Sequence, residues 1–391
     1  MQFFDLDDDE RVIAETAAAF AEKRLAPNAL EWDRTHHFPV DELREAAELG
    51  MAAIYCDEEA GGSGLRRIDA VRIFEQLAAA DPTVAAFLSI HNMCAWMVDT
   101  YGTREQRTTW VPKLASMEAI ASYCLTEPGA GSDASALRTK AVRCSDSAGD
   151  VYILDGVKQF ISGAGSSDVY IVMARTGGDG PRGISAFIVE KDTPGVSFGA
   201  NEEKMGWKAQ PTAQVIFEGA RVPADCMLGG ADGEGTGFSI AMNGLNGGRI
   251  NIAACSLGGA QAAFEKAAGY LADRQAFGGA LLDEPTIRFT LADMATALET
   301  SRTLLWRAAS ALDADHPDKV ELCAMAKRYV TDACFDVADQ ALQLHGGYGY
   351  LSEYGLEKIV RDLRVHRILE GTNEIMRVVI GRAEAARARA S

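Results

Sequence analysis

The chain has 391 residues, 48% of them apolar and 24% charged, which is the composition of a globular protein with two or three domains. Acidic residues outnumber basic ones by 56 to 38, which gives a formal net charge of −18. A field of that sign repels nucleic acid and anionic membrane surfaces, so we expect neither as a partner.

The chain opens on the acidic segment MQFFDLDDDE, which has the features of neither a secretory signal nor an Arg-rich transit peptide. The eight cysteines are scattered, without a C-x-x-C pair or nearby histidines at metal-ligand spacing. We therefore expect no disulfide framework and no metal site. These observations favour a bacterial cytoplasm, or the mitochondrial matrix if the chain is a mature form.

Residues 1–121 are expected to form an N-terminal helical domain. Helical periodicity begins in DERVIAETAAAFAEKRLAP and resumes after Pro39, a residue that favours the first turn of a helix. The stretch 82–98 contains no Asp, Glu, Lys or Arg. It is shorter than a bilayer span and includes His91 and Asn92, so we interpret it as a buried helix.

Residues 122–235 have the pattern of a small β domain. Short runs of β-branched and aromatic residues alternate with turn sequences such as SAGD, GGDGPRG and DTPG. These runs predict an antiparallel, barrel-like middle domain. The predicted strands are residues 150–162, 167–176, 183–191 and 213–223.

Residues 236–391 return to a helical period. Leu291, Met294, Leu298 and Leu305 share one face of a long helix whose flanks are charged. Long helices of this kind pack as bundles, which predicts a C-terminal four-helix bundle. The predicted fold class is therefore α+β, with the β domain between two helical domains.

Two motifs lack the local context that their usual functions require. GDGPRG at 178–183 fits a dinucleotide-binding pattern but links two predicted strands, so we interpret it as a hairpin loop. GVSFG at 195–199 fits the nucleophile-elbow pattern, but Ser197 lies in a strand-like run. An acyl-thioester hydrolase with His345 or His366 as its base remains the alternative from a different class.

Two glycine-rich segments are candidate ligand sites. In SYCLTEPGAGSD, residues 122–133, Gly129 and Gly131 permit close backbone approach, and Thr126 and Ser132 offer hydroxyl groups. In the segment 343–364 a helix ends at two glycines and another begins soon after, an arrangement that suits a phosphate or a ring carbonyl. An ordinary turn and a Gly-terminated helix explain these segments equally well.

Glu370 and Arg249 are candidate charged groups in apolar surroundings. Glu370 follows Ile368 and Leu369, so it is either a solvated charge at a helix end or a carboxylate held dry to take a proton. Arg249 lies in an apolar helix, where a buried guanidinium needs an acceptor. The residues alone favour a solvated Glu370 and an Arg249 that forms a structural ion pair.

Long segments of the chain, in the same order, resemble the acyl-CoA dehydrogenases: YCLTEPGAGSD, FISGAG and QALQLHGGYGYLSEYGLEKIVRDLRVHRILEGTNEIMR. The resemblance covers nearly all of the chain. It implies FAD as the cofactor, an acyl-CoA as the substrate, an electron-transferring flavoprotein as the electron acceptor, and a homotetramer. LSIHNMCAWM, KMGWKAQPTAQVIFE and LNGGRINIAACSLG are most similar to family members that oxidise isobutyryl-CoA.

The resemblance also implies the residues that hold the cofactor and the substrate. Many relatives carry a Gln that touches FAD where this chain has Pro285, which puts that contact in question. Arg274 and Phe277 match residues that usually reach the cofactor of a neighbouring subunit. The implied cofactor contacts are Tyr123, Cys124, Leu125, Thr126, Ser132, Phe160, Ile161, Ser162, Arg274, Phe277, Gln343, Leu344, His345, Gly346, Gly347, Thr372, Asn373 and Glu374. The implied acyl-CoA contacts are Ser132, Asn246, Gly247, Gly248, Arg249, Gly371 and Arg382.

In the resembled family a carboxylate removes the α-proton of the acyl group while the β-hydride passes to the flavin. Glu370 matches the usual base. Some relatives carry the base at about the position of Gly248, and glycine cannot take a proton, so the resemblance implies Glu370. A flavin ribityl hydroxyl and the backbone N–H of Glu370 would polarise the thioester carbonyl, and desolvation would raise the pKa of Glu370.

The implied reaction converts isobutyryl-CoA to methacrylyl-CoA, a step of valine catabolism. Two alternatives keep the same chemistry and change the substrate to 2-methylbutyryl-CoA or butyryl-CoA. A third is an oxygen-using acyl-CoA oxidase.

Overall fold

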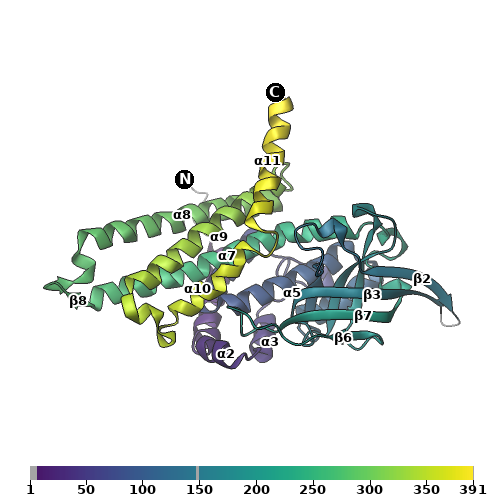
Figure 1. Cartoon of the computed structure of the whole chain (residues 1–391), viewed down its shortest axis with the longest axis horizontal. Coiled ribbons are helices and arrows are strands. Elements are labelled where there is room, and N and C mark those ends of the chain that lie inside the picture. The colour runs from purple at the N-terminus through teal and green to yellow at the C-terminus, as the bar shows by residue number, and fades with distance from the viewer. Residues whose placement is uncertain (1–6, 147–148, 391) are drawn as a thin grey trace.

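The computed structural model describes residues 7–146 and 149–390. The molecule is elongated, with a β-sheet at one end and a bundle of long helices that extends to the other end (Figure 1). Its α-helices are α1 (Asp8–Phe20), α2 (Ala29–Thr35), α3 (Val40–Glu48), α4 (Arg67–Ala80), α5 (Pro82–Tyr101), α6 (Arg104–Ala115), α7 (Gly237–Asp273), α8 (Pro285–Asp313), α9 (Lys319–Leu344), α10 (Leu356–Arg364) and α11 (Asn373–Ala390). Its strands are β1 (Ala121–Cys124), β2 (Lys140–Asp146), β3 (Gly149–Ser162), β4 (Val169–Arg175), β5 (Ile184–Glu190), β6 (Val196–Phe198), β7 (Thr212–Pro223), β8 (Gln275–Ala276) and β9 (Gly279–Ala280).

The N-terminal helices begin where the sequence supplies caps. Asp7 and Glu10 form a capping box at the start of α1. Asp81 accepts a hydrogen bond of 2.8 Å from the backbone N–H of Thr83, with Pro82 in the first turn of α5. Most of α5 is buried, which confirms the prediction of a buried helix. Within the described part of the chain, no helix has both the length and the apolar character that a membrane crossing requires.

The middle of the chain forms a mixed sheet with the strand order β1-β4-β2-β3-β7-β6, and β5 pairs with β4. The four predicted strands correspond to β3, β4, β5 and β7, and these are confirmed. The expectation of a purely antiparallel domain is wrong in two places, because β1 pairs with β4 in parallel and β2 makes a short parallel contact with β4. A parallel pair needs a long connection, and the β2–β3 hairpin supplies it here.

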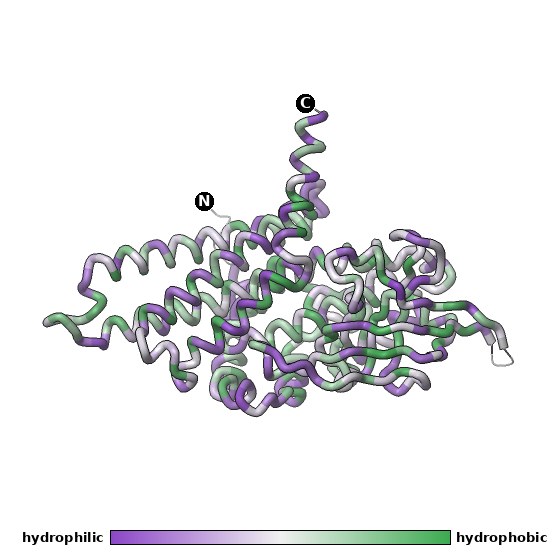
Figure 2. Tube along the Cα trace, viewed as in Figure 1, coloured by the Kyte–Doolittle hydropathy of each residue, from purple (hydrophilic) through white to green (hydrophobic). Residues whose placement is uncertain are grey.

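The long helices α7, α8 and α9 pack against one another, and one apolar core joins them to α1, α4, α5 and α10. Gly258 permits the close approach of α7 and α4, because a β-carbon there would lie 2.0 Å from the backbone oxygen of Glu75. Figure 2 shows apolar residues along the strands and along the inner parts of these helices. α11 projects from the body of the molecule (Figure 1).

Candidate active site

Glu370 lies in a turn that a non-glycine residue rarely adopts. Its φ is +56°, and the φ of the next residue, Gly371, is +86°, so two consecutive residues are left-handed. Glycine tolerates this conformation, whereas a residue with a side chain is strained by about 1 kcal/mol or more. The turn connects a short helical segment, Val365–Arg367, to the first residue of α11. Contacts from other elements must therefore stabilise it.

The carboxylate of Glu370 faces the middle of α7. Glu370 is half-buried, and its Oε2 atom is inaccessible to solvent and has no hydrogen-bond partner among the described residues. A β-carbon on Gly248 would lie 2.4 Å from Oε2 and 3.0 Å from Oε1. Burial raises the pKa of Glu370 to about 7, although the positive charges of Arg249 and Lys327 oppose that rise. The side chain is therefore a dry carboxylate and not a solvated helix-end charge.

Arg249 lies beside this turn but does not pair with a carboxylate in the described part of the chain. It is 6% exposed, and its Nη1 donates to Oδ1 of Asn246 at 2.7 Å. Its Nε donates to the backbone oxygen of Glu370 at 3.3 Å. The expected structural ion pair is thus replaced by two neutral acceptors, one of which belongs to the turn that carries Glu370.

The segment that follows β1 forms a second wall of the site. The hydroxyl oxygen of Tyr123 is buried and has no hydrogen-bond partner among the described residues. The backbone N–H of Gln159 donates to the oxygen of Thr126 at 2.8 Å, which joins this segment to the end of β3. A β-carbon added at Gly129 or at Gly131 would meet open space. Backbone and hydroxyl groups are therefore available to a ligand along this wall.

Glu127, which was not among the predicted site residues, anchors this wall. Its Oε1 accepts hydrogen bonds from Nζ of Lys158 at 2.8 Å and from the backbone N–H of Thr139 at 2.9 Å. Its Oε2 accepts from the backbone N–H of Arg138 at 2.6 Å. The carboxylate thus accepts hydrogen bonds from backbone N–H groups of the loop that have no backbone partner. In the sequence, the only signal of this role is the position of Glu127 before Pro128.

Phe160 places an aromatic ring at the edge of the site. Its φ is +59°, and 64% of its surface is exposed, although its neighbour Ile161 is buried. Ser162, the last residue of β3, accepts a hydrogen bond of 2.5 Å at its backbone oxygen from the hydroxyl of Ser122. An exposed ring held by a fixed backbone suits a flat aromatic ligand. The orphaned hydroxyl of Tyr123 and the open approach at Gly129 fit the same kind of ligand.

The other implied cofactor residues lie elsewhere in the chain. Arg274, which ends α7, and the 93% exposed Phe277 belong to the tip of the helix bundle, near β8 (Figure 1). At the nearby end of α9, His345 stacks on Tyr270 with ring centroids 4.4 Å apart. One chain therefore brings together Tyr123–Thr126, Phe160–Ser162, Asn246–Arg249 and Glu370–Asn373. It leaves Arg274, Phe277 and Gln343, Leu344, His345, Gly346 and Gly347 in a separate group.

Two further implied residues are on α11. Glu374 is exposed and lies 3.7 Å from Arg377 in an ion pair. Arg382 is exposed on the projecting part of the helix, about 14 Å along its axis from Asn373. The described chain does not place Arg382 in the cleft beside Glu370.

The arrangement that a hydrolase needs is not formed around Ser197. This residue lies in β6, which a loop and not a helix follows, so the nucleophile-elbow interpretation is wrong. His345 contacts the backbone oxygen of Ala341, and His366 contacts the hydroxyl of Ser256. Neither histidine is hydrogen-bonded to Ser197 among the described residues. The GDGPRG motif lies in the β4–β5 connection, as predicted.

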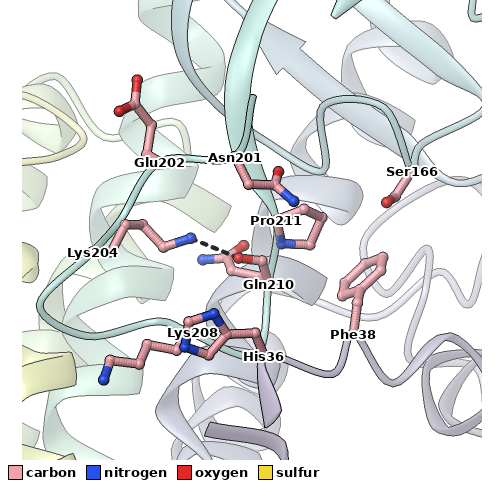
Figure 3. Close-up of a pocket in the computed structure, with 9 residues that line it drawn as sticks. All are labelled: His36, Phe38, Ser166, Asn201, Glu202, Lys204, Lys208, Gln210 and Pro211. Atoms are coloured by element: carbon pink, nitrogen blue, oxygen red, sulfur yellow. Dashed lines mark hydrogen bonds between the residues drawn. The ribbon is translucent and has the colours of Figure 1, made fainter. Parts of the chain in front are cut away.

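A separate cavity of about 170 Å³ lies between the α2–α3 connection and the segment before β7 (Figure 3). Lys204 borders it and donates to the backbone oxygen of Gln210 at 2.7 Å and to Oγ1 of Thr212 at 3.0 Å. Glu370 does not line this cavity. The residues described above around Glu370 therefore lie apart from this cavity.

Gly248→Ala tests the geometry between α7 and the base. The new methyl group would displace the carboxylate of Glu370, so we expect a roughly tenfold or greater loss of the rate that depends on this group. The free energy of unfolding should change by less than about 1 kcal/mol, because the obstructed atoms end a flexible side chain. Gly269→Ala, on the same helix with open space around it, is the matched control. An unchanged rate in Gly248→Ala would contradict the assigned geometry.

The chain matches the models of three domains of one family. It matches "Acyl-CoA dehydrogenase, N-terminal domain" at residues 7–118, the middle domain at 122–220 and the C-terminal domain at 235–385. It is 54% identical over 378 residues to isobutyryl-CoA dehydrogenase of Dictyostelium discoideum, covering 96% of this chain and 89% of the relative. It is 51% identical to isobutyryl-CoA dehydrogenase of Bos taurus, covering 97% and 89%. Both relatives are named as mitochondrial.

Solved structures agree over the whole chain. Butyryl-CoA dehydrogenase of Megasphaera elsdenii superposes with a TM-score of 0.93 at 38% identity, covering 98% of this chain and 99% of that one. A chain in the structure of the electron transferring flavoprotein of Acidaminococcus fermentans gives 0.93 at 40%, covering 97% and 98%. An acyl-CoA dehydrogenase of Bacillus anthracis complexed with FAD gives 0.92 at 34%, covering 99% and 68%. By sequence and by fold, this chain belongs to the acyl-CoA dehydrogenase family.

Proposed function

We propose that this enzyme is an FAD-dependent dehydrogenase that converts isobutyryl-CoA to methacrylyl-CoA, with Glu370 as the base. The observation that carries the proposal is the Oε2 atom of Glu370, which is buried and has no hydrogen-bond partner among the described residues. A carboxyl group whose pKa is near 7 is well matched to proton abstraction near neutral pH. The substrate is supported by two isobutyryl-CoA dehydrogenases that are identical to this chain at more than half of the aligned positions.

The residues of the cleft fit a flavin. Phe160 and Ile161 with Ser162 would flank its ring on one side, and Tyr123, Cys124, Leu125 and Thr126 on the other. When bound, FAD supplies the ring that accepts a hydride from the β-carbon of the acyl group. Ser132, Thr372, Asn373 and Glu374 complete the proposed contacts within one chain.

The chain's own residues perform the proton chemistry. Glu370 takes the α-proton, and the backbone N–H of Glu370 donates to the thioester oxygen where negative charge develops. Arg249 fixes the following peptide through the backbone oxygen of Glu370. Asn246, Gly247, Gly248 and Gly371 leave space for the acyl thioester beside the base. Apolar walls exclude water, which maintains the raised pKa of Glu370.

The separate group of cofactor residues supports assembly of at least two chains. Arg274, Phe277 and Gln343–Gly347 lie at the tip of the bundle, away from the cleft of their own chain. We propose that they complete the cofactor site of a neighbouring chain in a homotetramer. Exposed aromatic side chains at this tip, Phe277, Phe289 and Tyr350, agree with burial against another copy.

The proposed electron acceptor is an electron-transferring flavoprotein, because a chain of nearly identical fold occurs in a structure of such a flavoprotein. The eight cysteines are free thiols, which suits the reducing cytoplasm or mitochondrial matrix. Two relatives that are named as mitochondrial support the second of these compartments.

The purified protein is expected to be yellow, and anaerobic isobutyryl-CoA should bleach its visible flavin band. We expect kcat/KM for isobutyryl-CoA to exceed that for butyryl-CoA and for 2-methylbutyryl-CoA by roughly tenfold or more, the scale of one methyl group in a fitted pocket. Stopped-flow absorbance checks this prediction. Preferred bleaching by butyryl-CoA would support a straight-chain dehydrogenase. Peroxide formation would support an oxidase, and release of free CoA from a colourless protein would support the hydrolase.

A further inference from the structure

Lys327 is a buried cation next to the turn that carries Glu370. It lies on α9, and its side chain is fully buried. Its Nζ donates to the backbone oxygen of Gly371 at 2.8 Å and to Oδ1 of Asn373 at 2.9 Å. Both acceptors are neutral. Within the described chain no carboxylate lies within ion-pair distance of this ammonium group, so its burial is costly and calls for an explanation.

Two cations hold two successive carbonyl groups of this turn. Arg249, from α7, donates to the oxygen of Glu370, and Lys327, from α9, donates to the oxygen of Gly371. Glu370 and Gly371 are the two consecutive residues of this turn that have positive φ. A strained backbone persists only where its surroundings fix it. The paired contacts fix both peptide planes after the base, and with them the direction of its side chain.

Asn373 also fixes the position of the ammonium group of Lys327. Its Nδ2 donates to Oγ1 of Thr331 at 3.0 Å and to Oδ1 of Asp332 at 2.9 Å. Thr331 and Asp332 lie on α9, one turn after Lys327. The first residue of α11 is thus tied to the helix that carries Lys327. The lysine has little freedom to move away from the turn.

The charged and titratable groups around Lys327 come from several elements. Glu370 and Glu374 raise its proton affinity from the C-terminal side, Asp332 does so from α9, and Arg249 lowers it from α7. His366 also lies close, but burial lowers its pKa to about 3, so it is neutral. Around Glu370, Tyr123 and Cys94 are kept protonated because burial raises the pKa of each. Arg249 and Lys327 are therefore the cations that act on the base.

Resting on the proposed role of Glu370, we propose that Lys327 is a positioning residue that orients the turn of the base and whose charge keeps Glu370 ready to accept a proton. Burial lowers the pKa of Lys327 to about 7, against the attraction of Glu370. The pKa of Glu370 is raised to the same region. Near pH 7 the ionised carboxylate of Glu370 and the ammonium group of Lys327 stabilise each other. Removing the ammonium charge must therefore raise the proton affinity of Glu370 further.

Lys327→Met tests the charge, since it keeps the length of the side chain and removes the ammonium group. The rate of flavin reduction by isobutyryl-CoA should rise with pH through a midpoint set by Glu370. In Lys327→Met this midpoint should lie about one pH unit higher, with roughly a fivefold lower rate at pH 7. Lys327→Arg keeps a positive charge and should hold the midpoint at or below that of the wild type. Lys319→Met, on the same helix in an exposed ion pair with Asp315, should leave the profile unchanged.

Infrared titration of the protonated carboxyl band that disappears in Glu370→Gln gives a second readout that needs no turnover. It should show the same upward shift in Lys327→Met. Equal slowing at every pH with an unmoved midpoint would overturn the tuning role, as would an Arg variant that shifts upward like Met. If Lys327→Met does not fold, the Arg variant and its titration still decide. Wild-type protein that no acyl-CoA bleaches would refute the proposed function instead, while the infrared titration would still report on Lys327.

Discussion

Glu370→Gln is expected to lower the rate of flavin reduction by isobutyryl-CoA by roughly 10³-fold or more, because it removes the base and keeps its shape. The variant should still purify as a yellow protein and bind acyl-CoA, since the neutral amide disturbs neither wall of the cleft. Stopped-flow absorbance under anaerobic conditions measures the rate, and equilibrium dialysis measures binding. Retained turnover in Glu370→Gln would refute the assignment of the base.

The same variant should be more stable than the wild type above neutral pH. The folded-state pKa of Glu370 is about 7, above its ordinary value of 4.5, so the wild type loses stability as pH rises from 4.5 through 7. Glu370→Gln has no such proton to lose. Urea unfolding should therefore give equal stabilities near pH 4 and a gain on the order of 3 kcal/mol at pH 8. A gain of the same size at both pH values would contradict the titration of Glu370.

Glu127→Ala is expected to destabilise the protein by about 3 to 5 kcal/mol, because it leaves Lys158 buried without its carboxylate. Lys158 has no exposed surface, and Glu127 is its ion-pair partner at 2.8 Å. The substitution also frees two backbone N–H groups, those of Arg138 and Thr139. Urea unfolding measures the loss, and the visible absorbance per chain measures retained flavin, which should also fall.

Glu127→Gln is the matched control for that experiment. It keeps the size of the side chain and one acceptor oxygen, so it should cost less than Glu127→Ala. In the wild type burial opposes ionisation of Glu127, but Lys158 and the donated hydrogen bonds lower its pKa overall. The double variant Glu127→Ala, Lys158→Met should recover part of the lost stability, since no unpaired charge remains. A loss below about 1 kcal/mol in Glu127→Ala would show that the ion pair has little structural importance.

Local patterns in the sequence were sufficient for elements whose signal is contained in their own residues. The alternation in 150–162 predicted β3, and the uncharged stretch 82–98 predicted the buried α5. The patterns could not predict the parallel pairing of β1, because β1 has four residues and its partner follows it by about 45 positions. Nor did they identify β6, which has three residues. Strand pairing of this kind depends on tertiary contacts.

In the candidate site, too, local sequence patterns did not reveal the features that depend on tertiary contacts. Composition alone favoured a solvated Glu370, and only the resemblance to a family pointed to a dry one. The burial of Glu370 comes from α7 and α9, which are distant in sequence, so its neighbours could not reveal it. Lys327 stands in CAMAKRYV among apolar and small residues, and that lysine in an apolar helical face was a signal of a buried partner. The partner, a backbone oxygen 44 positions away, leaves no mark in composition.

The missing side chain of Gly248 has a consequence for how such enzymes are compared. A β-carbon on Gly248 and the carboxylate of Glu370 would occupy nearly the same space, although the first residue lies on α7 and the second in the turn before α11. A relative with an acid on the first segment and a small residue on the second could deliver the same oxygen to the same carbon. Aligned columns would then suggest a lost base where the reaction centre is intact, so an inactive relative should be diagnosed from both positions together.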